Sequence, residues 1–204
     1  MAVGNPRRSR RRSEAYHELG ETPDSLTHLL AEFPNAILIR TFSKAFGLAG
    51  LRLGYALAHP AVTKLLLRAK LPWNISSLTL AAGLAALEDV EEFEQRMDYL
   101  RKGRDYLEIE LRKMRALSVI AGEGNFVLLD VAKVGVSAEA IVEAMLAEGV
   151  YIRSLAVHHA KRSFVRVTVG TEEQNRRCVE AMRKVLARLG RWAPVAAVDR
   201  LSQP

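Results

Sequence analysis

The spacing of apolar residues predicts a strand followed by three helices in the first part of the chain. Residues 36–42 (AILIRTF) form a short apolar run between a Pro-Asn pair and a glycine-containing turn, which is typical of a strand. Helices are predicted over residues 61–70, 76–89 and 91–115, and the second is apolar on most of its surface, so we expect it to be buried. The third helix has an apolar stripe that is expected to face a core: Phe93, Met97, Leu100, Leu107, Leu111 and Met114.

The second part of the chain mixes strands and helices. Short β-rich runs separated by glycines predict strands over residues 117–120, 125–131, 150–155 and 164–169. Helices are predicted over 137–148 and 171–189. Ser137 is placed to cap the first of these helices, and Thr171 with Gln174 has the spacing of a capping box. This mixture indicates a compact α+β domain.

The change from consecutive helices to mixed strands and helices indicates a domain boundary near residue 90. We expect a basic disordered arm (1–12), the closing portion of a larger domain (13–90), a complete small α+β domain (91–189) and a loose tail (190–204). No apolar run approaches the ~18 residues that span a membrane, so no membrane partner is expected. Cys178 is the only cysteine, which excludes an intrachain disulfide and fits a reducing cytoplasm.

The positive charge is concentrated at the start. The net charge is +7, and most of it comes from five arginines in residues 1–12: Arg7, Arg8, Arg10, Arg11 and Arg12. Such an arm can bind nucleic acid or an anionic membrane surface. No aromatic residue is interleaved with the arginines as a stacking platform, so a disordered terminus is the preferred interpretation and a nucleic-acid partner is not expected.

Residues 43–55 carry the most specific motif, S-K-x-x-x-L-x-G-x-R-x-G-Y. Lys44 stands where the apolar strand ends, a place from which an amine can face a cleft and attack a carbonyl. Gly47 and Gly50 are expected to allow positive φ and a close approach to a ligand. Arg52 can form two hydrogen bonds with phosphate oxygens, and Ser43 can donate another. A phosphate-binding P-loop is excluded, because the lysine precedes the glycines.

This motif resembles that of the fold-type I aminotransferases that use pyridoxal phosphate (PLP), most closely the histidinol-phosphate aminotransferases. The resemblance implies an α/β fold of this type, truncated to the end of the large domain plus the small α+β domain. It implies that Lys44 holds PLP as a Schiff base and carries the proton, with Ser43 and Arg52 near the phosphate. Tyr16, in Glu-Ala-Tyr, would bond the phenolic oxygen of PLP. Further similar segments are residues 72–74, 125–127, 151–153 and 164–171.

Two arginines are candidates for binding substrate. In the strand 164–169, Val165, Val167 and Val169 share one face, and Arg166 lies on the other with Phe164 and Thr168. An arginine there is a solvated edge residue or a carboxylate anchor, and the Lys44 motif favours the anchor. The resemblance gives the same role to Arg166 and places Arg153 near the distal end of the substrate.

The resemblance predicts transfer of an amino group between an amino acid or amino phosphate and a 2-oxo acid. The amino donor expected from it is histidinol phosphate. The resemblance also implies that the intact enzyme is a homodimer. The alternatives are an aminotransferase for another amino acid, a threonine-phosphate decarboxylase, and an inactive fragment or binding module that uses the arginine arm. No metal site is expected, since His158-His159 lacks ligand spacing. Ser13 stands where the family has an aspartate that pairs with the ring nitrogen. The family's N-terminal half is not represented, so we expect no activity from this chain alone.

Overall fold

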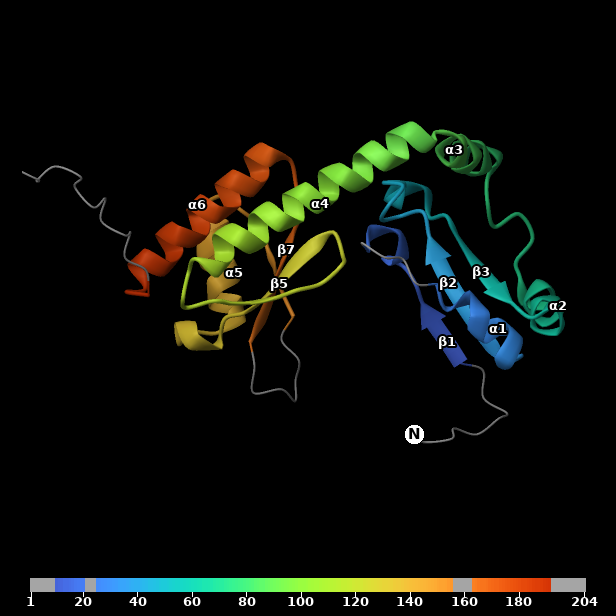
Figure 1. The fold of residues 1–204 in the computed structure, drawn as a ribbon, viewed down its shortest axis with the longest axis horizontal. Helices are drawn as coiled ribbons and strands as arrows, with labels where there is room; N and C mark the ends of the chain where they lie inside the picture. Colours follow the sequence, from blue (N-terminus) through green and yellow to red (C-terminus); the bar gives the residue numbers. More distant parts are fainter. Residues whose placement is uncertain (1–9, 21–24, 156–162, 192–204) are drawn as a thin grey trace, which may run out of the picture. The chain divides into compact units, whose positions relative to one another are not determined.

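The computed structural model describes residues 10–20, 25–155 and 163–191 of the chain. The chain divides into two compact units. Unit 1 comprises Met1–Arg101 and Glu123–Asn125, and unit 2 comprises Lys102–Gly122 and Phe126–Pro204. The helix α4 (Val90–Arg112) therefore contributes residues to both units (Figure 1).

Unit 1 is built on a three-stranded sheet in the order β1-β2-β3. The strands are β1 (Arg10–Ser13), β2 (Ala36–Thr41) and β3 (Gly54–Ala58). β1 runs parallel to β2, whereas β3 pairs with β2 antiparallel. Four short helical turns connect these strands: η1 (His17–Leu19), η2 (Leu26–His28), α1 (Leu29–Glu32) and η3 (Ala49–Leu51). A separate small apolar cluster forms around Leu19, Ala45 and Met97, so the first part of α4 packs beside the segment that follows β2.

Two helices follow the sheet in unit 1, and each has a side-chain cap. α2 (Pro60–Ala69) begins after His59, whose Nδ1 accepts from the Ala61 N–H. α3 (Ser77–Glu88) begins after Ser76, whose Oγ accepts from the Thr79 N–H. The expectation that α3 is buried is wrong, because Gly83 is its only buried residue. A helix that is apolar all round needs a neighbour on every side, and the described residues do not provide one.

Unit 2 is a four-stranded antiparallel sheet with helices. The order is β4-β5-β7-β6, formed by β4 (Ser118–Ile120), β5 (Phe126–Asp130), β7 (Phe164–Thr168) and β6 (Arg153–Ser154). The helices are η4 (Ala132–Val134), α5 (Ala138–Ala147), α6 (Glu172–Arg188) and the end of α4 (Figure 1). The core side chains are almost fully buried, among them Leu107, Leu111, Met114, Leu129, Ile141, Met145, Val165, Met182 and Leu186.

Most predicted elements are confirmed within one or two residues. Ser137 caps α5 through the Ala140 N–H, and the capping box of Thr171 and Gln174 is present in full. The strand predicted over 150–155 is reduced to β6. β3 was not predicted, because its sequence GYALA begins with glycine and shows no alternation of apolar and polar residues. Val165, Val167 and Val169 are buried as expected.

The predicted domain boundaries differ in two places from the units of the structure. The compact units divide within α4, after Arg101, whereas the sequence indicates a boundary near residue 90. Arg10, Arg11 and Arg12, which the sequence assigns to a basic arm, form β1 with Ser13 through backbone pairing to β2. The rest of the arm and residues 192–204 of the tail lie outside the described residues.

Candidate functional site

The loop that follows β2 fixes the direction of Lys44. Its backbone is closed by hydrogen bonds from the Phe42 N–H to Leu53 O (3.1 Å), from Leu48 to Phe42 O (3.0 Å) and from Gly47 to Lys44 O (3.1 Å). Gly47 has a φ of 69°, a conformation that favours glycine, as predicted. Gly50 does not use the freedom that glycine allows: among the described residues of this loop, the other positive φ belongs to Arg52, at 53°.

Lys44 lies beside the aromatic ring of Tyr16. Its Nζ is 5.7 Å from the ring centroid, and its side chain is half-buried. Next to it, Ala45 is fully buried in the small cluster to which Tyr16 and Phe46 also pack. The Lys44 amine therefore lies next to the Tyr16 phenol and beside the apolar cluster around Ala45. These neighbours limit the directions in which the amine can point. The structure brings together two residues, Tyr16 and Lys44, that the sequence places 28 positions apart.

Ser43 and Arg52 belong to the same loop and currently bond within it. The Ser43 N–H donates to Thr41 Oγ1 (3.1 Å), and the Thr41 hydroxyl donates to Ser43 Oγ (2.9 Å). The exposed guanidinium of Arg52 donates to Ala49 O (2.9 Å). Ser43 Oγ keeps its own proton to donate, and Arg52 keeps further N–H groups. Both residues can therefore donate to an anion at this loop.

A buried ion pair that the sequence analysis missed holds the segment with Tyr16 against β2. Glu14 Oε2 accepts from Arg40 Nε (2.9 Å), and its Oε1 accepts from the Leu26 N–H (2.7 Å). Burial by itself raises the pKa of Glu14, but the bonds from Leu26 and Arg40 together outweigh it, so this pKa is lowered. The available signal was Arg40 itself, an arginine within the apolar strand AILIRTF.

Arg96 of α4 is a second positioning residue that sequence reasoning missed. It donates to Phe46 O (2.6 Å) and pairs with Glu92 (2.7 Å) on the same helix. A side chain at position 47 would approach the Arg96 guanidinium to 3.2 Å, so Gly47 leaves room for this bond. Arg96 thereby anchors the backbone two residues after Lys44. Arg96 precedes Met97, which is buried in the apolar cluster of unit 1 with Leu19 and Ala45.

In unit 2 the two candidate arginines lie opposite each other on neighbouring strands. Arg153 of β6 lies opposite Arg166 of β7, and both line a cavity of about 180 Å³ together with Tyr151, Ile152 and Thr168. Arg166 lies 5.2 Å from the ring centroid of Phe126. Its Nε is buried and has no hydrogen-bond partner among the described residues. Like charges on opposite residues destabilise a sheet, so an anion between these guanidinium groups would be stabilised.

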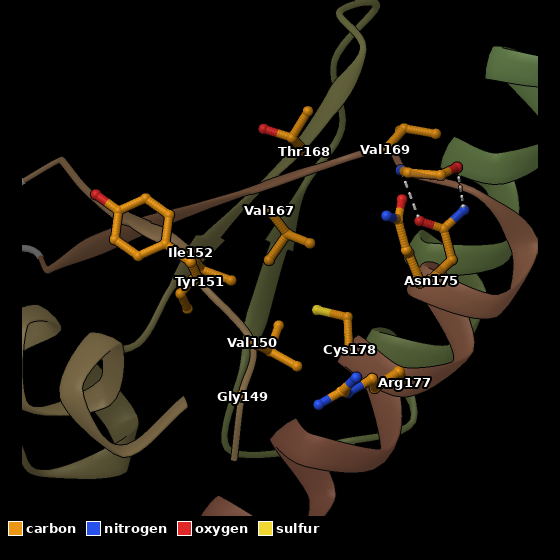
Figure 2. Close-up of a pocket in the computed structure, with 12 residues that line it drawn as sticks. Gly149, Val150, Tyr151, Ile152, Val167, Thr168, Val169, Asn175, Arg177 and Cys178 are labelled. Atoms are coloured by element: carbon orange, nitrogen blue, oxygen red, sulfur yellow. Dashed lines mark hydrogen bonds between the residues drawn. The ribbon is translucent and has the colours of Figure 1, made fainter. Parts of the chain in front are cut away.

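A larger cavity of about 400 Å³ lies next to this one in unit 2 (Figure 2). Figure 2 shows it between α6 and the segment from Gly149 to Ile152, with Cys178 on its wall. Burial raises the pKa of the Cys178 thiol to about 11, so this thiol is protonated at neutral pH. The amide of Asn175 closes one end, accepting from the Gly170 N–H (2.9 Å) and donating to Gly170 O (3.2 Å). Cys178 is thus a packing residue, as the sequence indicates.

Three further observations concern the predicted site. Ser13 lies at the exposed end of β1, where a hydroxyl stands in place of the carboxylate that the resemblance implies. Within residues 10–20, 25–155 and 163–191, no three His, Cys, Asp or Glu side chains gather as metal ligands. His158-His159 lies outside the described residues. No described helix is both long and apolar enough to cross a membrane.

Comparison with known proteins places this geometry in a family. The model of the family "Aminotransferase class I and II" matches residues 13–182. A histidinol-phosphate aminotransferase of Symbiobacterium thermophilum is 42% identical over 173 residues, covering 85% of this chain and 46% of that protein. The histidinol-phosphate aminotransferase 2 of Pseudomonas fluorescens (strain Pf0-1) is 43% identical over 178 residues, with shares of 86% and 46%. The chain thus spans about half the length of the curated relatives it matches.

A solved structure gives the same result. The histidinol-phosphate aminotransferase of Sinorhizobium meliloti, in complex with pyridoxal-5'-phosphate, superposes with a TM-score of 0.80 at 28% identity, covering 88% of this chain and 49% of that one. The fold is therefore that of the fold-type I PLP aminotransferases, represented by the end of the large domain and the small domain. With a match that covers most of its length, the chain belongs to the class I and II aminotransferase family.

Proposed function

We propose that this chain forms the lysine-bearing half of a PLP-dependent aminotransferase. The observation that carries this proposal is Lys44: it lies in the loop after β2, which is closed by backbone hydrogen bonds, and its amine lies beside the Tyr16 ring. The relatives that the chain matches are named histidinol-phosphate aminotransferases, and the S. meliloti protein was solved with pyridoxal-5'-phosphate. When bound, that cofactor supplies an aldehyde for the amine and a ring that withdraws electrons.

The residues around Lys44 fit most of this cofactor. Lys44 would bond its aldehyde carbon and later carry a proton, because it is half-buried and directed by the loop. Tyr16 would donate to its phenolic oxygen. Ser43 and the exposed Arg52 have hydrogen-bond donors free for the phosphate. The fit fails at the ring nitrogen, where Ser13 offers a hydroxyl and no charge. We therefore expect weaker electron withdrawal than an aspartate would give.

The arginine pair of unit 2 supports an anionic substrate. Arg153 and Arg166 face each other across β6 and β7, and Arg166 Nε is buried and unbonded within the described residues. A phosphate monoester carries between one and two negative charges near pH 7. It can therefore compensate both guanidinium groups, which a single carboxylate cannot. We propose histidinol phosphate as amino donor, 2-oxoglutarate as acceptor, and a homodimer as the state of the intact enzyme.

A phosphate-selective decarboxylase is the second candidate. A decarboxylase from Sulfurospirillum multivorans superposes with a TM-score of 0.76 at the same 28% identity as the aminotransferase from S. meliloti. Both reactions need a lysine and an anion site, so the residues described above serve either. The two differ in product: decarboxylation of a phosphorylated amino acid releases CO2, whereas transamination yields glutamate from 2-oxoglutarate.

The experiment supplies the part of the family fold that this chain lacks. The 204-residue chain is co-expressed with the part of the S. thermophilum protein outside the aligned residues, given PLP, and assayed for glutamate and for CO2. We expect glutamate formation that is abolished by Lys44→Ala and lowered by Arg166→Ala mainly through a higher KM for histidinol phosphate. Arg177→Ala, in the neighbouring cavity, is the matched control and should change little. CO2 without glutamate would favour the decarboxylase.

A further inference from the structure

Arg166 lies where charge repulsion acts on its side chain. Its cross-strand partner on β6 is Arg153, and both arginines line the cavity of about 180 Å³. Two like charges at opposite positions of a sheet repel each other. An arginine side chain also has many rotatable bonds, so it keeps a single place only where a neighbour holds it there. The place of the Arg166 guanidinium therefore depends on what lies on its other side.

Phe126 of β5 lies on that other side. The strand order β4-β5-β7-β6 places β7 between Phe126 and Arg153. In the register of β5 and β7, Leu128 lies opposite Arg166. Phe126 precedes Leu128 by two residues, so it shares a face of the sheet with Arg166 and is its diagonal neighbour. Aromatic and long side chains reach each other across such a diagonal, and Arg166 Cζ is 5.2 Å from the Phe126 ring centroid.

The Phe126 ring attracts the guanidinium. The face of an aromatic ring carries partial negative charge, and a cation within about 6 Å of the centroid is stabilised, more strongly where water is excluded. Arg166 Nε is buried, so water is excluded from this atom. Repulsion by Arg153 and attraction by Phe126 act in the same direction, since the two residues lie on opposite sides of β7. Together they keep the guanidinium over the ring and apart from Arg153.

The backbone that carries Phe126 is well held. β5 lies between β4 and β7 and pairs with both. The next residue, Val127, is 1% exposed and belongs to the core of unit 2. β6, which carries Arg153, has only two residues and stands at the end of the strand order. A group that orients another side chain works best on a rigid element, and β5 meets this condition better than β6.

We propose that Phe126 is a positioning residue of the arginine pair. Its ring fixes the Arg166 guanidinium beside the cavity, so that Arg166 and Arg153 can both donate to one phosphate group. Phe126 acts through Arg166 and needs no contact with the phosphate itself. The identity of this phosphate, as part of the substrate, rests on the proposed function, but the place of Arg166 does not.

The test measures phosphate binding without PLP, in the 204-residue chain with inorganic phosphate as the probe. Phe126→Leu keeps an apolar side chain but removes the aromatic face, and it should weaken phosphate binding about threefold to tenfold. Phe126→Tyr keeps the face and should bind as the unchanged chain does. The affinities come from titrations followed by NMR of the arginine Nε–H groups. The Arg166 signal, identified by its loss in Arg166→Lys, should shift in Phe126→Leu even before phosphate is added, because the ring current is gone.

The matched control is Phe164→Leu. Phe164 lies two residues before Arg166 on the same face of β7, whereas the Arg166 guanidinium lies over the Phe126 ring. This control should leave the phosphate affinity unchanged. Phe126→Met, which also lacks an aromatic face, repeats the test with a different side-chain shape in case Phe126→Leu does not fold.

Four results would overturn the proposal: no phosphate binding by the unchanged chain, equal affinity in Phe126→Leu, equal loss in Phe126→Tyr, or an Arg166 signal that does not respond to loss of the ring. In the co-expressed enzyme, Phe126→Leu should raise the KM for histidinol phosphate and leave kcat unchanged, because Lys44 belongs to the other unit. Absence of glutamate formation, with these differences in phosphate binding intact, would count against the proposed function alone.

Discussion

The two units of this chain are made from similar sequence patterns but reach different degrees of completion. In unit 2, α6 buries one apolar face, and seven of its residues are buried: Asn175, Cys178, Val179, Ala181, Met182, Val185 and Leu186. In unit 1, α3 is more apolar along its whole length and buries only Gly83. An apolar helix needs other elements to pack against, but its own sequence does not specify them. Within the described residues, unit 2 supplies such elements for α6, whereas unit 1 does not supply them for α3.

The difference extends to the chemistry. The arginine pair of unit 2 lies on a sheet whose core is closed, so its geometry is set by packing within the chain. The Lys44 loop of unit 1 is held by backbone bonds, by Arg96 and by the Glu14–Arg40 pair, while within the described residues the outer strands of its sheet pair only with β2. The Lys44 loop therefore depends on a few specific bonds, whereas the arginine pair depends on a packed core.

The largest expected difference between the units comes from matched leucine truncations. Leu186→Ala, in the core of unit 2, should lower the free energy of unfolding by about 2–5 kcal/mol, because it removes buried contacts and leaves a cavity. Leu67→Ala, on α2, should change it by less than about 0.5 kcal/mol. Urea unfolding followed by circular dichroism measures both. Equal costs would contradict the contrast between the units.

The Cys178 thiol tests how closed unit 2 is. With a pKa of about 11 instead of its ordinary value of 9.0, its thiolate fraction at pH 8 is about 100-fold lower than in the unfolded chain. Reaction with a thiol reagent should slow at least in that proportion and become fast in urea. Because the folded pKa is raised, the stability that the protonated thiol contributes is complete below pH 9.0 and is lost as the pH rises towards about 11. Fast native reaction would show that unit 2 opens.

The Glu14–Arg40 pair tests how unit 1 is held. Glu14→Gln should lower the free energy of unfolding by about 1–3 kcal/mol, because the largely buried Arg40 loses its anion. The pKa of Glu14 is lowered below its ordinary value of 4.5, so its contribution is present above pH 4.5 and is lost as the pH falls through the folded value. The difference between wild type and Glu14→Gln should therefore shrink below pH 4.5. A constant difference would assign the cost to packing.

A smaller loss of stability should come from removing the N-cap of α6. Thr171→Ala removes the side-chain acceptor for the Gln174 N–H and should cost about 1 kcal/mol of unit 2 stability. Thr171→Ser keeps this acceptor and is the matched control. Hydrogen exchange along α6 should accelerate in the alanine variant, while exchange in α2 and α3 stays unchanged. A simultaneous change in α2 and α3 would show that the two units unfold together.

Local signals in the sequence predicted much of this fold. The capping box at Thr171, the cap at Ser137 and the alternation around Arg166 are each determined by neighbouring residues, and the structure confirms them. The loop at Lys44 was predicted by its motif, including the positive φ of Gly47. The roles of Tyr16, Ser43, Lys44, Arg52, Arg153 and Arg166 remain predictions, supported by where their side chains lie.

Features that depend on distant residues were not predictable. Glu14 and Arg40 are 26 positions apart, and the sequence around each residue does not indicate which residue it pairs with. The exposure of α3 depends on which elements pack against it, and its own apolar pattern does not specify them, so the predicted burial was wrong. The division of α4 between units depends on which surfaces its two halves meet. Arg52 rather than Gly50 adopts positive φ, because the closure of the whole loop selects the position.

The most direct test of the account is chemical labelling of the amine. The chain is co-expressed with the unaligned part of the S. thermophilum protein, incubated with PLP and reduced with borohydride. The product is digested and mapped by mass spectrometry. The account predicts the phosphopyridoxyl group on Lys44 and no significant labelling of Lys64 or Lys70, the lysines of the neighbouring helix segment. A label on a different lysine, or none although the complex has formed, would contradict the assignment of Lys44.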